Sequence, residues 1–366
     1  MKAESRRIAR RLFRAAAVTV LWSIFMLTGM ALAARYVKPD VLWFFQLFAI
    51  VLPYLAWSMI VTTVMAIVVR QKSLLVFQAI LLIAVIIRFL PAGDYAIPDE
   101  AHSLSLVSYN SPYPMHRISP ENEAEFESIL GDAEPNIVGF QETFLGFINR
   151  GTERIVGRSD VLNVFGSAGY EISRPHPKTE ILFYQPVLTN FPVDSTRKII
   201  LPDNPYPIES EILRINFRWE GRPVVLYNIH LASYGASKPW HEGNSSVVSI
   251  GFWYKYLKQY RRAIWARAWE AQQIRAMIEL ESVPVVVLGD FNATRHNWSY
   301  ATIQKGMVDV LHSTRSGLRM TYHSRYPFAR IDHILTSNHF VPVAGSVLNT
   351  TRSDHRAIWG RVALAR

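Results

Sequence analysis

The chain has 366 residues, and half of them are hydrophobic, so its length allows two or three structural units. It contains no cysteine, which excludes disulfides, thiolate metal sites and a cysteine nucleophile. The formal net charge is +10, but residues 1–90 hold eleven of the 39 basic residues and only two of the 29 acidic ones. The rest of the chain is therefore nearly neutral, which is not typical of a domain that binds a polyanion.

Three long apolar stretches follow the N-terminus: Ala15–Ala34, Val41–Val69 and Ser73–Leu90. At about 1.5 Å per residue, each is long enough to cross a hydrocarbon core of roughly 30 Å, the third only just. None of them has the regular polar face of a helix that covers a soluble core. We therefore expect residues 1–90 to form a membrane region with three transmembrane helices.

Basic residues indicate the orientation of this region. Arg6, Arg7, Arg10, Arg11 and Arg14 precede the first apolar stretch, and Arg70 and Lys72 separate the second from the third. Positive charge marks the cytoplasmic side, so we expect a multi-pass protein with a cytoplasmic N-terminus and its remaining chain outside the cytoplasm. The sequence "GMALAAR" also resembles a signal-peptidase site. Its cleavage is an alternative that leaves this orientation unchanged.

Residues 91–103 read as a linker because they are rich in proline, glycine and acidic residues. Residues 104–366 are enough for one sizeable domain, with helical patterns at 121–131 and 263–280. Many short strand-like runs and few helices predict an α/β fold in which helices cover two packed sheets. The runs are "LSLVSYN", "NIVGFQET", "EILFYQP", "ILRINFRW", "PVVLYNIHLAS", "VPVVVLGDFN", "RIDHILTS" and "HRAIWGRVAL".

Polar residues recur at the ends of these predicted strands. In "VVVLGDFNAT", Asp290 and Asn292 are two residues apart, so on a strand they share a face. Each such residue alone is also compatible with a turn or a helix cap. Together they favour a catalytic site, because loops at strand ends present functional groups on a rigid scaffold. The residues are Asn110, Glu142, His230, Asp290, Asn292, Asp332, Asp354 and His355.

The motifs "LVSYN", "GFQET", "YNIHLAS", "LGDFNAT", "RIDHILTS" and "SDHRAIWG" resemble, in order, those of the endonuclease/exonuclease/phosphatase superfamily. The resemblance covers residues 104–366. It implies a four-layer α/β/β/α sandwich of two packed mixed sheets, and hydrolysis of a phosphoester with Mg²⁺ or Mn²⁺. It also implies that Glu142, with Asn110 alongside, holds the metal, and that Asp354 reaches a metal. Hard cations of this kind prefer oxygen ligands.

The resemblance implies roles for the other residues too. Asp290 would take a proton from the attacking water while Asn292 orients water or phosphate. His355, held by Asp332, would stabilise or protonate the phosphoryl group, and His230 would donate to a non-bridging oxygen. The general base is either Asp290 or the His355–Asp332 pair, and the sequence does not choose between them.

Three functions remain open. The first is a membrane-anchored phosphoesterase that acts on phospholipid head groups, with membrane lipid as its partner. The second is an anchored nuclease, although Pro112 stands where abasic-site endonucleases carry an acid. The third is an inactive binding module. Arg319, Arg325 and Arg330 are candidates for a substrate-binding groove, or are ordinary surface residues.

The segment "GFWYKYLKQYRRAIW", residues 251–265, is aromatic on one side and basic on another if it is a helix. Such helices lie at membrane surfaces, with aromatic rings at the interface and cations toward anionic lipid. The alternative is that the aromatic side packs on the protein's own sheet.

Overall fold

The computed structural model describes residues 2–90, 102–112, 120–149, 153–174, 181–201, 205–206, 211–234, 248–314 and 319–365. Most of the expected linker, residues 91–101, lies outside these ranges. The chain divides into two compact units. One comprises residues 1–90 with His296–Trp298, and the other comprises residues 91–295 and 299–366.

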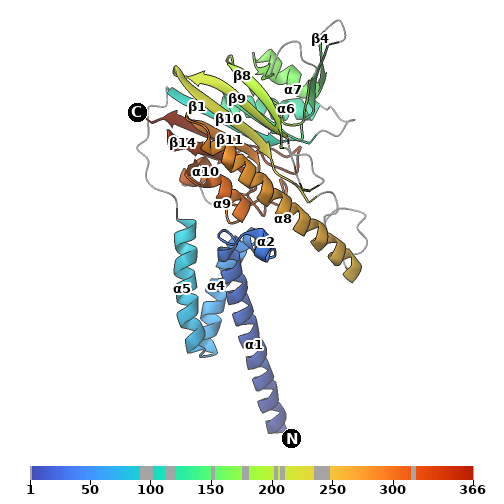
Figure 1. Cartoon of the computed structure of the whole chain (residues 1–366). Coiled ribbons are helices and arrows are strands. Elements are labelled where there is room, and N and C mark those ends of the chain that lie inside the picture. Colours follow the sequence, from blue (N-terminus) through green and yellow to red (C-terminus); the bar gives the residue numbers. More distant parts are fainter. Residues whose placement is uncertain are drawn as a thin grey trace. The chain divides into compact units, whose positions relative to one another are not determined.

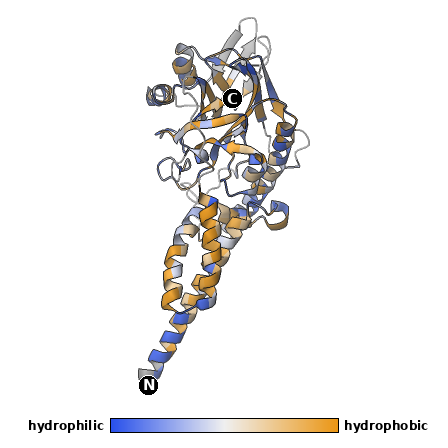
Figure 2. Cartoon of the chain, turned by 90° about the vertical axis from the view of Figure 1, so that its left-hand side faces the viewer, coloured by the Kyte–Doolittle hydropathy of each residue, from blue (hydrophilic) through white to orange (hydrophobic). Residues whose placement is uncertain are grey.

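The N-terminal unit is helical. Its elements are α1 (Lys2–Ala33), α2 (Pro39–Leu42), α3 (Phe45–Ile50), α4 (Leu52–Val68) and α5 (Lys72–Phe89). Helix α1 packs against α4 and α5, with Leu21, Ala66 and Leu74 buried between them. Figure 2 shows hydrophobic residues around most of these helices, whereas the first turns of α1 are mostly hydrophilic. A helix that is apolar all round needs an apolar environment.

Only two of these helices, α1 over Arg6–Ala33 and α5, are long and apolar enough to cross a membrane. The second stretch divides into α2, α3 and α4, so the expected third span is not shown by helix length and stays a prediction. Helix α4 has 17 residues, about 25 Å of helix. Pro53 explains where it begins, because proline lacks an N–H donor and occupies the first turn of α4.

Two six-stranded sheets form the centre of the second unit in the part of the chain that the structure describes. The first has the order β14-β15-β1-β2-β7-β5, and the second β12-β13-β11-β10-β9-β8. The first sheet comprises β1 (Ser103–Asn110), β2 (Ile137–Gln141), β5 (Glu171–Ile172), β7 (Val187–Thr189), β14 (Phe340–Val347) and β15 (Ile358–Leu364). The second comprises β8 (Ser195–Ile200), β9 (Glu211–Trp219), β10 (Arg222–His230), β11 (Val285–Asp290), β12 (Met307–Asp309) and β13 (Asp332–Ser337). A small sheet joins β4 (Glu153–Gly157), β3 (Leu145–Asn149) and β6 (Ile181–Phe183).

Successive side chains of a strand point to opposite faces of its sheet, and this explains how the layers stack. On β11, Val286 and Leu288 enter the core between the two sheets, while Val285 and Val287 enter the core on the opposite face. Side chains alternate between faces along a strand, so an all-apolar run such as this one needs cover on both sides. The inter-sheet core also includes Leu106 of β1, opposite β11.

Helices cover the two outer faces (Figure 1). Helix α6 (Pro120–Ala133), with the short α7 (Ser159–Val161) and the π-helix η2 (Leu162–Gly166), packs on the first sheet. Helices α8 (Ile250–Glu279) and α9 (Trp298–Gln304) contribute to the core on the second sheet. The small helix α10 (Val310–Ser313) follows β12. The predicted four-layer α/β/β/α sandwich is therefore confirmed.

Candidate active site

Strand direction brings the polar residues together. Strands β1 and β2 are parallel, as are β10 and β11, and the two pairs face each other across the core. Asn110, His230 and Asp290 are the last residues of β1, β10 and β11, and Glu142 directly follows β2. Strand β13 is antiparallel to β11, and β15 is antiparallel to β1. The structure therefore corrects one expectation: Asp332 begins its strand and His355 precedes β15, so both lie at the same edge as the strand ends.

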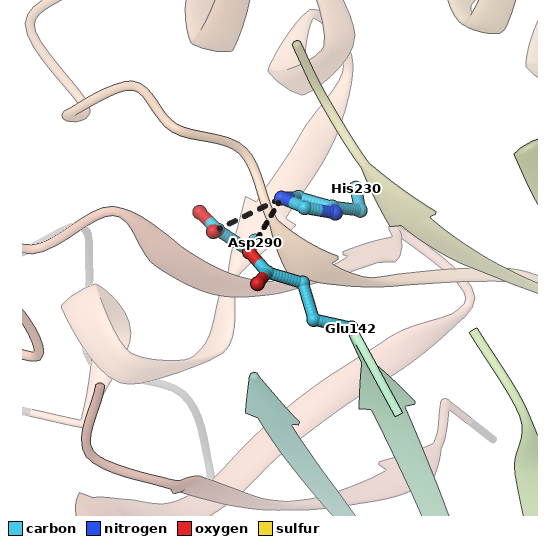
Figure 3. A group of neighbouring side chains, drawn as sticks. All are labelled: Glu142, His230 and Asp290. Carbon is cyan, nitrogen blue, oxygen red and sulfur yellow. Dashed lines mark ion pairs between the residues drawn. The ribbon is translucent and has the colours of Figure 1, made fainter. Parts of the chain in front are cut away.

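Asn110 lies at the centre of this cluster. Its Nδ2 donates to Glu142 Oε1 at 3.1 Å and to Asp290 Oδ2 at 3.0 Å. His230 Nε2 lies 3.5 Å from Glu142 Oε1 and 3.6 Å from Asp290 Oδ2 (Figure 3). The Glu142 side chain is 41% exposed, whereas that of Asp290 is 1% exposed. Solvent therefore reaches the cluster from the Glu142 side.

Two polar atoms of the cluster are buried without a hydrogen-bond partner among the described residues. They are Oδ1 of Asn110 and Nε2 of His230. Because an unsatisfied buried polar atom is costly, both atoms fit a site that takes a ligand. The donor set suits a divalent cation, since Glu142, His230 and Asp290 each offer one ligand atom within 4.8 Å of the others.

His355 and Asp332 form a buried pair beside Asp290. His355 Nδ1 lies 3.0 Å from Asp332 Oδ2, and its Nε2 lies 3.7 Å from Asp290 Oδ2. Burial by itself lowers the pKa of His355, but the charges of Asp332 and Asp290 outweigh it and raise that pKa to about 10. The two carboxylates therefore favour the cationic, hydrogen-bond-donating form of the imidazole. The ring of Tyr322 lies against it, with centroids 5.0 Å apart.

Asp290 differs from a surface carboxylate in its electrostatics. Burial raises its pKa, His355 opposes this, and the charge of Asp332 raises it further. Its Oδ1 accepts from the backbone N of Asn292 at 2.7 Å, and its Oδ2 lies 3.3 Å from Asn292 Nδ2. Asn292 Nδ2 also donates to the carbonyl of Leu231 at 2.9 Å. Asn292 therefore ties the loop after β11 to the loop after β10.

Unusual backbone conformations lie at this edge. Glu142 and Asn292 have φ values of 54° and 46°, which are uncommon outside glycine. Gly289 has a φ of 142°, and a Cβ there would meet the carbonyl oxygen of Ile229 at 1.9 Å. Only glycine therefore lets β11 lie this close to β10 directly before Asp290.

Two residues of α8 that the sequence analysis missed support the site. Glu270 Oε2 accepts from the backbone N of Ala232 at 2.8 Å, and Arg267 donates to the carbonyl of Asn292. Both side chains are buried. The sequence does contain a signal for Arg267, because this charged residue falls at the helical spacing of a buried apolar stripe. The other residues of that stripe are Tyr260, Ile264, Ala271, Ile274 and Ile278.

Four predicted residues are not part of the side-chain contacts described above, although the charge of Asp354 also raises the pKa of His355. Asp354 is one of them, and its backbone carbonyl accepts from Ser324 N at 2.8 Å. Arg330 forms an ion pair with buried Asp309, and Arg319 donates to the carbonyl of Gly345. Arg325 is exposed. Two of the three candidate substrate arginines are thus held by the protein's own acceptors.

Several solved structures are similar to this chain. An endonuclease/exonuclease/phosphatase from Beutenbergia cavernae has 16% identity and a TM-score of 0.49, with 72% of each chain covered. A family protein from Bacteroides thetaiotaomicron has 16% identity and a TM-score of 0.49, covering 74% of this chain and 100% of its own. D. rerio TDP2, complexed with a single-strand DNA product, has 14% identity and a TM-score of 0.48, covering 71% of this chain and 98% of its own.

Among curated proteins, no similar sequence was found. Residues 110–355 match the family described as Endonuclease/Exonuclease/phosphatase family. The match runs from Asn110, at the end of β1, to His355, and so includes every residue of the cluster described above. Since it covers more than half of the chain, the protein belongs to the endonuclease/exonuclease/phosphatase family.

Proposed function

We propose that this protein is a membrane-anchored, divalent-metal-dependent phosphoester hydrolase whose second unit faces outside the cytoplasm and acts on phospholipid head groups. The observation that carries the catalytic part is the convergence of Asn110, Glu142, His230, Asp290 and the His355–Asp332 pair at one sheet edge. Carboxylates, amides and imidazoles in these positions are the groups that phosphoryl transfer requires.

Glu142 and Asn110 are the residues that we assign to the metal, with Mg²⁺ or Mn²⁺ as the candidates. Their support is the partly exposed Glu142 carboxylate and the unpartnered Asn110 Oδ1 among the described residues. A bound divalent cation would neutralise charge on the phosphate oxygens. His230, next to Glu142, would donate to a non-bridging oxygen.

Asp290 is the better candidate for the general base. A raised pKa makes a carboxylate a stronger proton acceptor, and burial raises the pKa of Asp290. The pKa of His355, in contrast, is raised by Asp332 and Asp290, which favours its protonated form and makes it the weaker candidate for taking a proton from water. His355 would instead donate to the phosphoryl oxygens. Asp332 keeps its ring oriented, and Asn292 orients the water or the phosphate.

The lipid assignment is supported by charge. The chain after residue 90 is nearly neutral, whereas a protein that contacts many phosphates along a strand needs a basic track. Arg319 and Arg330 do not supply one, because they bond to Gly345 and Asp309. A head group presents one phosphodiester at a time and needs no such track.

The outward orientation requires α1, α4 and α5 all to cross. Its support is the contact between Arg14 and the end of α4, where Arg14 Nη2 donates to the Val69 carbonyl at 3.4 Å. The turn with Arg70 and Lys72 therefore lies beside the basic first part of α1. Both would be cytoplasmic by the positive-inside rule, and this requires α4 to cross.

A substrate panel with matched metal conditions tests the proposal. We expect Mg²⁺ to support hydrolysis of a small soluble phosphodiester and a chelator to abolish it. Glu142→Gln keeps the shape but removes the charge that a hard cation needs, so it should nearly abolish turnover. Full activity in chelator or in Glu142→Gln would overturn the metal assignment. Phospholipid, single-stranded DNA and phosphomonoester members of the panel separate a lipid hydrolase from a nuclease or a phosphatase, and activity on none would favour an inactive binding module.

A further inference from the structure

The first turns of α8 extend beyond the sheet that the rest of the helix covers (Figure 1). We call residues 248–258 the α8 tip. Ser249 caps the helix by accepting from Phe252 N at 3.4 Å, so the tip is an ordered helical end. Further along the helix, Tyr260 and Ile264 are buried. This second part of the segment therefore packs on the protein itself, which was the alternative to a membrane-surface helix. Within α8, the exposed large hydrophobic side chains all lie in the tip.

The tip exposes large hydrophobic side chains on one face. Ile250, Trp253, Tyr254 and Leu257 are spaced by three, one and three residues, so they form a single stripe. Ile250 is 88% exposed and Tyr254 68%, and Val248, just before the helix, is 94% exposed. Such a cluster on a projecting helix marks an interaction surface.

The charges beside this stripe all have one sign. Lys255, Lys258 and Arg262 are exposed and lie on a neighbouring face at three- and four-residue spacing. No acidic residue occurs between Val248 and Trp269. In the part of the chain that the structure describes, none of these three cations forms an ion pair, so the tip combines exposed aliphatic and aromatic groups with positive charge.

We infer that the α8 tip is a docking surface for an anionic lipid bilayer. An amphipathic helix of this composition places its apolar stripe at the boundary of head groups and acyl chains and its cations toward anionic lipid. A nucleic acid would satisfy the lysines but would leave Val248, Ile250 and Leu257 exposed to water. A second copy of the chain would cover the apolar stripe but bring two basic faces together.

The same helix holds the catalytic edge through Arg267 and Glu270. A bilayer bound at the tip would therefore lie at one end of the element that supports the loops after His230 and Asp290. Docking does not require hydrolysis. A failure of the docking experiment would leave the proposed hydrolase activity untouched, and the reverse also holds.

Site-directed fluorescence on the full chain tests the inference. Because the chain has no cysteine, Tyr254→Cys gives one labelling site in the tip. Leu280→Cys, just past the other end of α8 and 86% exposed, is the matched control. The labelled proteins are reconstituted in nanodiscs of phosphatidylcholine, with or without phosphatidylglycerol. We expect a blue shift and quenching by brominated lipid at position 254, only in the anionic discs, and neither at position 280.

Charge removal sharpens the test. Lys255→Gln with Lys258→Gln should lower the ratio of docked to undocked protein about thirtyfold, the equivalent of about 2 kcal/mol for two lysines at an anionic surface. Arg197→Gln with Lys305→Gln removes two exposed charges elsewhere and should not change the ratio. If the fluorescence of the label at position 254 is the same in anionic and in neutral discs, the inference is overturned. If the label at position 254 responds to single-stranded DNA in neutral discs, the tip binds nucleic acid and the inference is overturned. If the label responds only to the number of protein molecules per disc, the tip contacts a second copy and the inference is overturned as well.

Discussion

Asp290 combines burial with an unusual number of polar neighbours. It accepts from Asn110 and from the Asn292 backbone, and it faces the imidazoles of His230 and His355. A carboxylate that is 1% exposed is costly unless such partners compensate for its desolvation. A carboxylate that stays buried despite its desolvation cost is a strong candidate for a catalytic role, because groups with perturbed pKa values concentrate at functional sites.

Asp290→Asn should lower turnover at least about a hundredfold, since an amide cannot accept the proton of the attacking water. His355→Ala should cause a loss of the same order by removing a cationic donor. Steady-state kinetics on a soluble phosphodiester measures both, and circular dichroism checks the fold. Asp194→Asn, at an exposed position, is the matched control and should retain full activity. Near-normal turnover in either site variant would exclude that residue from the mechanism.

His333 makes the stability of the second unit pH-dependent. Burial, and then the charge of Arg330, lower the pKa of His333 to about 3. A histidine that is neutral when folded but titrates near 6.5 when unfolded stabilises the protein fully above pH 6.5. That contribution is lost as the pH falls toward 3, by up to about 1.4 kcal/mol per pH unit.

We therefore expect the melting temperature of the wild-type chain to fall between pH 6.5 and pH 3 more steeply than that of His333→Gln. The variant should be less stable at pH 7, because it loses the contact of His333 Nε2 with the Ala293 carbonyl at 2.9 Å. Thermal unfolding at several pH values gives both slopes. Parallel curves would show that His333 does not carry this pH dependence.

At the scale of elements, strand direction and one helix explain the site. The parallel pairs β1–β2 and β10–β11 end at one edge, and the antiparallel β13 and β15 begin there. Helix α8 then fixes the loops after β10 and β11 through Glu270 and Arg267. The site thus depends on contacts made by an element that supplies none of its predicted catalytic groups.

Glu270→Ala should cost about 1–3 kcal/mol of stability, because the backbone N–H of Ala232 would stay buried without an acceptor. Turnover should fall as well, since the loop after His230 loses its anchor. Glu270→Gln keeps an acceptor oxygen and should recover most of both losses. Chemical denaturation and kinetics of the three proteins check this. If the glutamine variant is no better than the alanine variant, the role of Glu270 lies in its charge and not in this hydrogen bond.

At the scale of the whole molecule, the proposed membrane anchor makes a prediction that depends on the number of its crossings. If α1, α4 and α5 all cross, the N-terminus and the second unit are on opposite sides. If α4 does not cross, they are on the same side. Helix α4, with 17 residues, is at the short end for a span. In the proposed topology, the side on which the second unit lies therefore depends on this one helix.

Labelling of single cysteines distinguishes the two cases. Glu4→Cys reports on the N-terminus and Arg197→Cys on the second unit, and both positions are exposed. With a membrane-impermeant maleimide on intact cells, we expect position 197 to react and position 4 to react only after permeabilisation. Labelling of both positions only after permeabilisation would place the catalytic unit in the cytoplasm.

The sequence alone determined the layers of the fold and the residue types of the site. Apolar runs such as "VPVVVLGDFN" predicted strands, and this run contains β11, because the tendency of a short apolar segment to form a strand is a local property. The order of the motifs "LGDFNAT" and "SDHRAIWG" and of their neighbours predicted the family, and the match over residues 110–355 confirms it.

Only the tertiary structure decided which polar residues meet. The contact of Asp332 with His355 was expected only from the family resemblance, because a local pattern carries no strand direction and does not show that Asp332 begins β13. Arg330 was equally ambiguous, because its partner Asp309 is distant in sequence and their pairing exists only in the folded chain. The division of residues 41–69 into three helices, and the exposure of the α8 tip beside a buried Tyr260, likewise depend on neighbours. Periodicity reports which faces of an element differ, whereas burial depends on what the rest of the chain brings against each face.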